Sequence, residues 1–386
     1  MKINRQYRRL LSVLPLALTI FLAAPISVSA AAAAVLTSSK VMVNGKSIAF
    51  EAYNIQGSNY FKLREIACTI SGTASQFSVG WDAQANAISL TRGQAYTLAG
   101  SEMSGKSTSN KSAQRTMSEV YLDGKKIYLT AYNIDGSNYF KLRDLGAALN
   151  FAVDWDGDAQ IVSIVTPDSV DARFAMEQTF YNEVRANDGV LLWMDSYWYP
   201  VFKGNSSAAN KMNAVYASED QTANVDANDL LQSYYSKQGY TYEEANDGRV
   251  GGMQVTTSVT YNKDDIVSFL HDNEWDGLGP HGEVDFSGHT FNIATGDELK
   301  LTDVLKVNAA NVSDILSKEF LSEYTIDDDM DSSLREASTL DIPFWLENDG
   351  VHIFYGPYTF YYAFGSREIV IPYSRADLIK EMFYKP

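Results

Sequence analysis

The chain has 386 residues, 45% of them hydrophobic and 20% charged, which is long enough for two or more domains and excludes a largely disordered protein. Its formal net charge of −17 disfavours nucleic acid as a partner, because an acidic surface repels the phosphate backbone. The one cysteine, Cys68, excludes an internal disulfide and a cysteine-based zinc site.

The first 30 residues have the pattern of an export signal. Residues 2–9 are basic, an apolar segment starts at Leu10, and Val28 and Ala30 place small residues at the −3 and −1 positions of a cleavage site. A membrane anchor is the alternative, since the apolar run is about long enough to span, but its prolines favour cleavage. We therefore expect a protein that is secreted or associated with the cell wall, with no membrane span after cleavage.

An internal repeat follows the signal, within residues 35–166. AYNIQGSNYFKLR begins at Ala52 and AYNIDGSNYFKLR begins at Ala131, and the similarity extends over residues 41–91 and 120–165. A copy of about fifty residues is only marginally stable alone, so the two copies are expected to share a core or to stack.

Each copy predicts the same series of elements. Asn44-Gly45 and Asp123-Gly124 lie between alternating apolar runs, which predicts a β-hairpin because both residue types tolerate positive φ. A second strand pair, a short helix and a final hairpin with one buried face follow in each copy.

The repeated pattern resembles a known family. YNI-x-GSNYFKLR followed by V-x-WD is similar to the copper-amine-oxidase-like amino-terminal domain, or stalk domain, of secreted bacterial proteins. The resemblance covers residues 35–166 and implies a non-catalytic spacer or adhesion module of α+β type. It implies no copper chemistry, because amine oxidases bind copper in a separate catalytic domain and no histidine lies in residues 1–270.

Residues 99–118 separate the copies and are rich in serine, threonine and lysine, which predicts a linker. Within them, Gly100 to Ser107 satisfies the P-loop pattern that places Lys106 on a phosphate. That motif requires a buried strand before it and a helix after it, and a polar run follows instead. The match is therefore interpreted as chance.

A second domain is expected over residues 170–386, in two parts at about 175–250 and 255–384. Alternating segments predict strands, residues 206–239 predict one or two helices, and residues 309–324 predict an amphipathic helix with Leu321 on its apolar face. A β-meander with an Asp349-Gly350 turn is expected near the end. The fold class predicted for the chain is α+β, with antiparallel sheets and short helices in two domains.

Three segments of this half also resemble a known type of domain. SYWYPVFKG from Ser196, GLGPHGEVDFSGHTFNI from Gly277 and FYGPYTFYYAFGSREIVIPYS from Phe354 are similar to the extracytoplasmic region of RsiV-type anti-sigma factors and some cell-wall polysaccharide deacetylases. In the anti-sigma proteins that region binds lysozyme, and in the deacetylases it accompanies a separate catalytic domain. The resemblance implies a recognition domain.

Two polar clusters could hold a metal. His271, His281 and His289 lie near several carboxylates, but no H-E-x-x-H or H-x-H spacing occurs. Residues 327–331 imitate the start of a calcium loop, although Ser332 stands where glycine is required. We therefore expect no metal site, no cofactor and no catalytic residue. The alternative is an envelope polysaccharide hydrolase or deacetylase with an unrecognised metal site between His271 and His289.

Tyrosine is unusually frequent, with 24 residues in the chain, and ten of them cluster in three segments of the second half. Tyrosine and tryptophan provide rigid amphipathic contact area against proteins and sugars, although alternating aromatics also fill small β cores. The function expected is a non-catalytic surface or secreted binding protein, in which the repeats present a recognition domain to a cell-wall glycan or a lysozyme-like protein. The predicted binding residues are Tyr358, Tyr361, Tyr362, Trp275 and His281.

Overall fold

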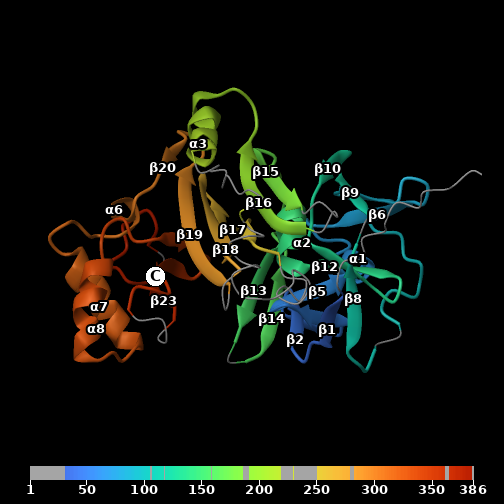
Figure 1. Ribbon diagram of the computed structural model, residues 1–386. Coiled ribbons are helices and arrows are strands. Elements are labelled where there is room, and N and C mark those ends of the chain that lie inside the picture. Colours follow the sequence, from blue (N-terminus) through green and yellow to red (C-terminus); the bar gives the residue numbers. More distant parts are fainter. Residues whose placement is uncertain are drawn as a thin grey trace, which may run out of the picture.

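The computed structural model describes residues 31–104, 107–116, 118–157, 159–185, 191–218, 229, 250–278, 282–360 and 365–384. The predicted signal peptide, Lys106, His281, Tyr361 and Tyr362 lie outside the described residues. Strands dominate, with a few short helices, which agrees with a multidomain α+β fold. In Figure 1 the two repeat copies lie on one side, long strands of the second half cross the middle, and α7 and α8 lie on the other side.

The two copies of the repeat fold into the same elements in the same order. The first copy comprises β1 (Ala32–Leu36), β2 (Lys40–Val43), β3 (Lys46–Ile48), β4 (Ala52–Ile55), β5 (Ser58–Lys62), α1 (Leu63–Thr69), β6 (Phe77–Asp82) and β7 (Ala87–Arg92). The second comprises β8 (Lys111–Arg115), β9 (Glu119–Leu122), β10 (Lys125–Ile127), β11 (Ala131–Ile134), β12 (Ser137–Lys141), α2 (Leu142–Leu149), β13 (Ala152–Asp156) and β14 (Ile161–Val165). Both predicted hairpin turns are confirmed, since Asn44, Gly45, Asp123 and Gly124 all have positive φ.

The copies are intertwined rather than stacked. They share a closed barrel of order β1-β4-β5-β12-β11-β8, which has approximate two-fold symmetry. Two further sheets form by exchange: the last hairpin of each copy pairs in parallel with the first hairpin of the other, β7 with β9 and β14 with β2. Buried residues of both copies join in one hydrophobic cluster. The prediction of a shared core is therefore confirmed.

The structure differs from the linker predicted over residues 99–118. Lys111–Arg115 form β8, which pairs with β1 and β11 and closes the barrel. Because β8 follows the P-loop-like residues where that motif needs a helix, the match stays interpreted as chance.

The second half contains a six-stranded sheet of order β15-β16-β17-β18-β19-β20. Its elements are β15 (Phe174–Arg185), β16 (Leu191–Phe202), α3 (Ser207–Ala217), β17 (Gly252–Lys263), β18 (Ile266–Asp276), β19 (Glu283–Asn292) and β20 (Asp297–Glu298). Helix α3 begins where the Ser206 hydroxyl accepts a hydrogen bond from the amide of Ala209. Trp198 of β16 is buried in the core of the repeats and so ties the two halves together.

A helical and β region ends the chain. It comprises α6 (Leu301–Val304), α7 (Val312–Glu323), α8 (Asp328–Ala337), β21 (Phe344–Leu346), β22 (Gly350–Tyr355) and β23 (Arg367–Pro372). The three strands form the predicted meander. Two expectations differ: Leu321 of α7 is exposed, and the acidic run is the start of α8, where Asp327 caps the amide of Met330. Among the described helices, none has the length and apolarity that crossing a membrane requires.

Candidate binding grooves of the repeat domain

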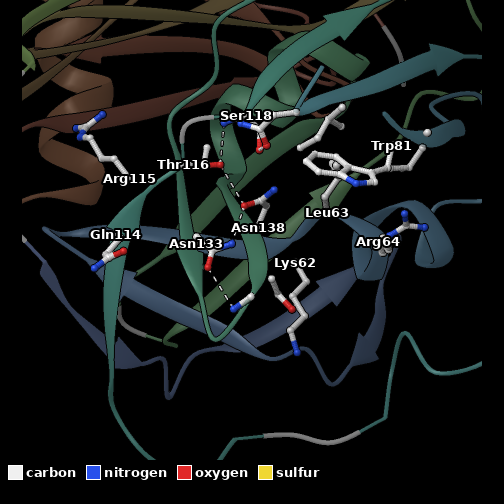
Figure 2. Close-up of a pocket in the computed structure, with 16 residues that line it drawn as sticks. Lys62, Leu63, Arg64, Trp81, Gln114, Arg115, Thr116, Ser118, Asn133 and Asn138 are labelled. Atoms are coloured by element: carbon white, nitrogen blue, oxygen red, sulfur yellow. Dashed lines mark hydrogen bonds between the residues drawn. The ribbon is translucent and has the colours of Figure 1, made fainter. Parts of the chain in front are cut away.

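The repeat domain carries an open groove of about 580 Å³, which we call the first groove. Figure 2 shows Asn133 and Asn138 in its middle, with Trp81 and Arg64 on one side and Gln114 and Arg115 on the other. Its lining residues are Lys62, Leu63, Arg64, Val79, Gly80, Trp81, Asn86, Ile88, Gln114, Arg115, Thr116, Ser118, Asn133, Gly136, Ser137 and Asn138.

The first groove is cationic in an acidic protein. Lys62, Arg64 and Arg115 line it, and no aspartate or glutamate is among its lining residues. The Trp81 ring is 50% exposed, which is unusual for so large an apolar side chain. Hydrogen bonds fix the amides between these groups, because the Asn138 carbonyl oxygen accepts from Asn133 and from the hydroxyl of Thr116. The first groove thus combines positive charge with the flat apolar ring of Trp81 and with the side-chain amides of Asn133 and Asn138, whose orientation is fixed by hydrogen bonds.

The three cations differ in what already binds them. Lys62 Nζ lies 2.6 Å from Glu51 Oε2. Burial opposes ionisation of Glu51, but this lysine and two tyrosine hydroxyls outweigh it and lower the pKa of the Glu51 carboxyl. The Arg64 guanidinium donates to the Tyr96 hydroxyl at 3.1 Å, and Arg115 lies 5.4 Å from the centre of the Tyr132 ring. Within the described residues, neither arginine has a carboxylate partner, so both can bind an external anion.

A second groove of about 1070 Å³ is the counterpart of the first. Every residue that lines the first groove has its repeat equivalent in the second: Val35, Leu36, Thr37, Ser39, Asn54, Gly57, Ser58, Asn59, Lys141, Leu142, Arg143, Val153, Asp154, Trp155, Gln160 and Val162. The second groove is also lined by the second half of the chain, through Val250, Gly252, Gln254, Glu274, Trp275, Asp276, Gly282, Glu283 and Val284. One groove is therefore walled by the C-terminal sheet, and its twin is open.

Charge pairs hold that sheet against the second groove. Lys141 pairs with Glu274 and also donates to Gln254 at 3.2 Å, while Arg143 pairs with Asp272 and lies 3.9 Å from Glu274. Burial opposes ionisation of Glu274, but Lys141 and Arg143 outweigh it and lower the pKa of this carboxyl. The repeated sequence Lys-Leu-Arg thus binds two carboxylates of β18 that stand two residues apart.

Two of the predicted binding residues, Trp275 and Tyr358, are described, and Trp275 is among the residues that line the second groove. Trp275 of β18 is 45% exposed and stands opposite Glu283 of β19. Tyr358 is 59% exposed, and its hydroxyl donates to Glu283. The structure therefore brings Tyr358 close to the Trp275 strand end, whereas His281, Tyr361 and Tyr362 lie outside the described residues.

The histidines considered as a metal site, His271 and His289, each make a different contact in the sheet. His271 is buried, its Nδ1 lies 2.7 Å from the Thr257 hydroxyl, and burial followed by the charge of His289 holds its pKa well below the usual range. His289 packs edge-to-face on it and pairs through Nδ1 with Glu298. These contacts favour a structural role in the sheet.

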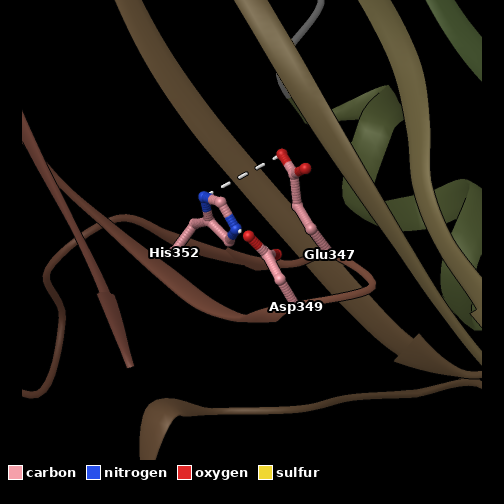
Figure 3. Close-up of side chains that lie close together, drawn as sticks. All are labelled: Glu347, Asp349 and His352. Atoms are coloured by element: carbon pink, nitrogen blue, oxygen red, sulfur yellow. Dashed lines mark hydrogen bonds and ion pairs between the residues drawn. The ribbon is translucent and has the colours of Figure 1, made fainter. Parts of the chain in front are cut away.

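Another cluster, which the sequence reasoning missed, surrounds His352 (Figure 3). Its Nε2 lies 2.9 Å from Asp349, and its Nδ1 lies 4.0 Å from Glu347 and also pairs with Glu368. Burial lowers the pKa of this imidazole, but the three carboxylates prevail and raise it to about 9. The same side chains of Glu347, Asp349 and His352 also have the spacing of a metal site, and binding of a metal ion there would require loss of the imidazole proton.

The grooves were also missed, although a signal for them exists. Lys62 and Arg64 recur as Lys141 and Arg143 at the helix start of each copy, although exposed charges vary freely in a purely structural repeat. The hairpin predicted around Asp349-Gly350 likewise places His352 opposite Trp345. The recurrence of a lysine and an arginine at equivalent positions of the two copies was therefore the sequence signal for the grooves.

Comparisons with known proteins give partial likeness of fold. No family model matches the chain, and no curated protein sequence is similar to it. A solved DUF3298 family member from Bacteroides fragilis is 15% identical, with a TM-score of 0.39, and the match covers 54% of this chain and 93% of that one. A DUF3298 family protein from Pseudomonas aeruginosa is 14% identical, with a TM-score of 0.35, and the match covers 56% and 99%. The stalk-domain and RsiV-type resemblances stay predictions from sequence.

Proposed function

We propose that the chain is a non-catalytic binding protein, secreted or held in a bacterial envelope, whose first groove binds an anionic partner. The observation that carries the proposal is the positive charge of the groove lining. Three cations and no carboxylate line the groove, in a chain of net charge −17. The acidic surroundings repel an anion everywhere else, so the groove becomes the favoured place for it.

The other groups in the groove support binding rather than catalysis. The Trp81 ring offers a flat apolar surface, and the amides of Asn133 and Asn138 offer donors and acceptors. Neither histidine nor carboxylate is among the sixteen lining residues, so the lining has no group suited to general acid–base catalysis near neutral pH.

A titration tests this proposal. The chain without residues 1–30 is titrated with a carboxylated polysaccharide, poly-glutamate and a neutral glycan at low and physiological salt. We expect salt-sensitive binding of at least one polyanion, and a loss of about tenfold or more in the double variant Arg64→Gln/Arg115→Gln, since charge-assisted hydrogen bonds are the strong ones. Lys46→Gln, on exposed β3 outside both grooves, is the matched control. The proposal is contradicted if the neutral glycan binds as tightly as the polyanions, or if the double variant binds the polyanions as tightly as the parent does.

A different surface suits the basic, lysozyme-like partner expected from the sequence. Trp275 and Tyr358 expose aromatic area beside Glu283, and Asp285 lies two residues further along β19. Aromatic anchors next to acids favour a basic protein, with encounter speeded by charge. We expect Tyr358→Ala to weaken binding to a lysozyme about tenfold. Tyr384→Ala, also exposed, should leave the affinity unchanged. Equal loss in both variants, or no binding at low salt, removes this candidate.

A further inference from the structure

We propose that the natural occupant of the first groove is an acidic, extended polypeptide segment whose carboxylates stand two residues apart. This inference rests on the proposed function, because it names the class of the anionic partner for the same groove. It comes from the molecule's own second groove, in which the equivalent residues already bind such a segment.

The precedent is the contact between α2 and β18. Asp272 and Glu274 lie on one face of an extended strand, because side chains alternate along it, so their carboxylates are about 7 Å apart. Arg143 and Lys141 pair with them from the end of β12 and the start of α2. Lys62 and Arg64 stand at the equivalent points of β5 and α1. The first groove therefore has a lysine and an arginine in the same order, but Lys62 is already paired with Glu51, so Arg64 is the member of this pair that has no carboxylate partner among the described residues.

The differences between the grooves explain why one is walled within the chain and the other is open. In the second copy, position 130 is threonine, and Lys141 obtains its carboxylate from Glu274 of the other half. In the first copy the equivalent position is Glu51, which already pairs with Lys62. Arg115 stands where the second copy has Leu36, and it lines both grooves. Arg64 and Arg115 are thus the cations available to an incoming strand.

A polypeptide fits these observations better than a glycan does. The two carboxylates that pair with Lys141 and Arg143 both come from one extended strand, β18. A strand supplies alternating carboxylates at a fixed spacing, whereas the acidic groups of a glycan need not match that spacing.

The experiment uses a peptide copied from the chain itself. A fluorescein-labelled peptide of sequence LHDNEWDGL, residues 270–278, is titrated with the chain lacking residues 1–30 at low salt, and anisotropy is read. The control peptide carries Asp272→Asn and Glu274→Gln. We expect the acidic peptide to bind about tenfold or more tightly than the control, because bonds to charged acceptors are the strong ones. Arg64→Gln should lose most of that preference, and Lys46→Gln should keep it.

A gain of affinity sharpens the test. Glu51→Thr gives the first copy the residue of the second and removes the nearer of the two carboxylates beside Lys62, which are Glu51 at 2.6 Å and Glu65 at 3.9 Å. We expect the peptide to bind about fivefold more tightly to this variant, and chemical denaturation must show that it unfolds as cooperatively as the parent. Binding of a carboxylated polysaccharide at Arg64 without peptide binding overturns the inference but keeps the proposed function. A dimer of the unliganded chain that Arg64→Gln abolishes assigns the groove to a second copy and also overturns it. If no anion binds, both proposals fail.

Discussion

The two grooves of the repeat domain have the same backbone and sixteen equivalent lining residues, yet only one is walled by the second half of the chain. Three differences between the copies change a charge at or beside the grooves: Glu51 against Thr130, Arg115 against Leu36, and Gly80 against Asp154. The first pair determines whether a lysine finds its carboxylate within its own copy or across the interface. The two copies therefore offer similar grooves whose charged residues differ.

The largest expected effect comes from removing the arginine of the walled groove. Arg143→Gln leaves the buried carboxylate of Asp272 without its cation, which should cost about 3 kcal/mol in the free energy of unfolding. The equivalent Arg64 is exposed and pairs with no carboxylate among the described residues. Arg64→Gln should therefore lower the free energy of unfolding by no more than about 0.5 kcal/mol. Chemical denaturation measures the loss of unfolding free energy in both variants. Equal losses would contradict the inference that only the arginine of the second groove is engaged by a carboxylate.

A pH series gives the next effect. The pKa of Glu274 is lowered in the folded chain, so its stabilisation is complete above the usual value of 4.5 and disappears as the pH falls through the lower folded value. Glu274→Gln should therefore cost about 2 kcal/mol at pH 7, and the difference from the parent should vanish in strong acid. Unfolding measured from pH 7 to pH 3 tests this. A difference that stays constant over that range would show that Glu274 acts through packing and not through charge.

A small effect on stability is expected at Trp81. Its ring is half exposed in the open groove, so Trp81→Ala should change the free energy of unfolding by no more than about 1 kcal/mol. Binding of the acidic peptide should nevertheless weaken, since exposed aromatics provide contact area. Trp155→Ala, the equivalent in the walled groove, is the control for peptide anisotropy. Loss of binding in both variants would point to a general effect on the fold.

Much of the fold could be predicted because it depends on local signals. Asn-Gly and Asp-Gly turns, alternation along the strands and the Asp349-Gly350 hairpin all act within a few residues. The barrel closure could not be predicted, because AAAVL and KSAQR, the equivalent strands β1 and β8, share only the buried Ala34 and Ala113. Their strand form is imposed by their neighbours in the barrel, which lie far away in sequence.

The site was harder to predict for a similar reason. Exposed aromatics near Tyr358 could be anticipated from composition, but the role of Lys141 and Arg143 depends on Glu274 and Asp272, which lie over a hundred residues further along the chain. The Lys-Leu-Arg triplet was visible in both copies from the start. Only the folded chain shows that one triplet is engaged across the interface and the other faces an open groove.

The exchange of hairpins between the copies has a consequence for what happens when the chain is cut. The connection between β7 and β8 joins two segments that already hold each other through β2 with β14, β7 with β9, β5 with β12 and β1 with β8. A protease that cleaves this exposed connection severs one covalent bond but none of those pairings. The two fragments should remain assembled, separate only in denaturant, and find each other again when it is removed.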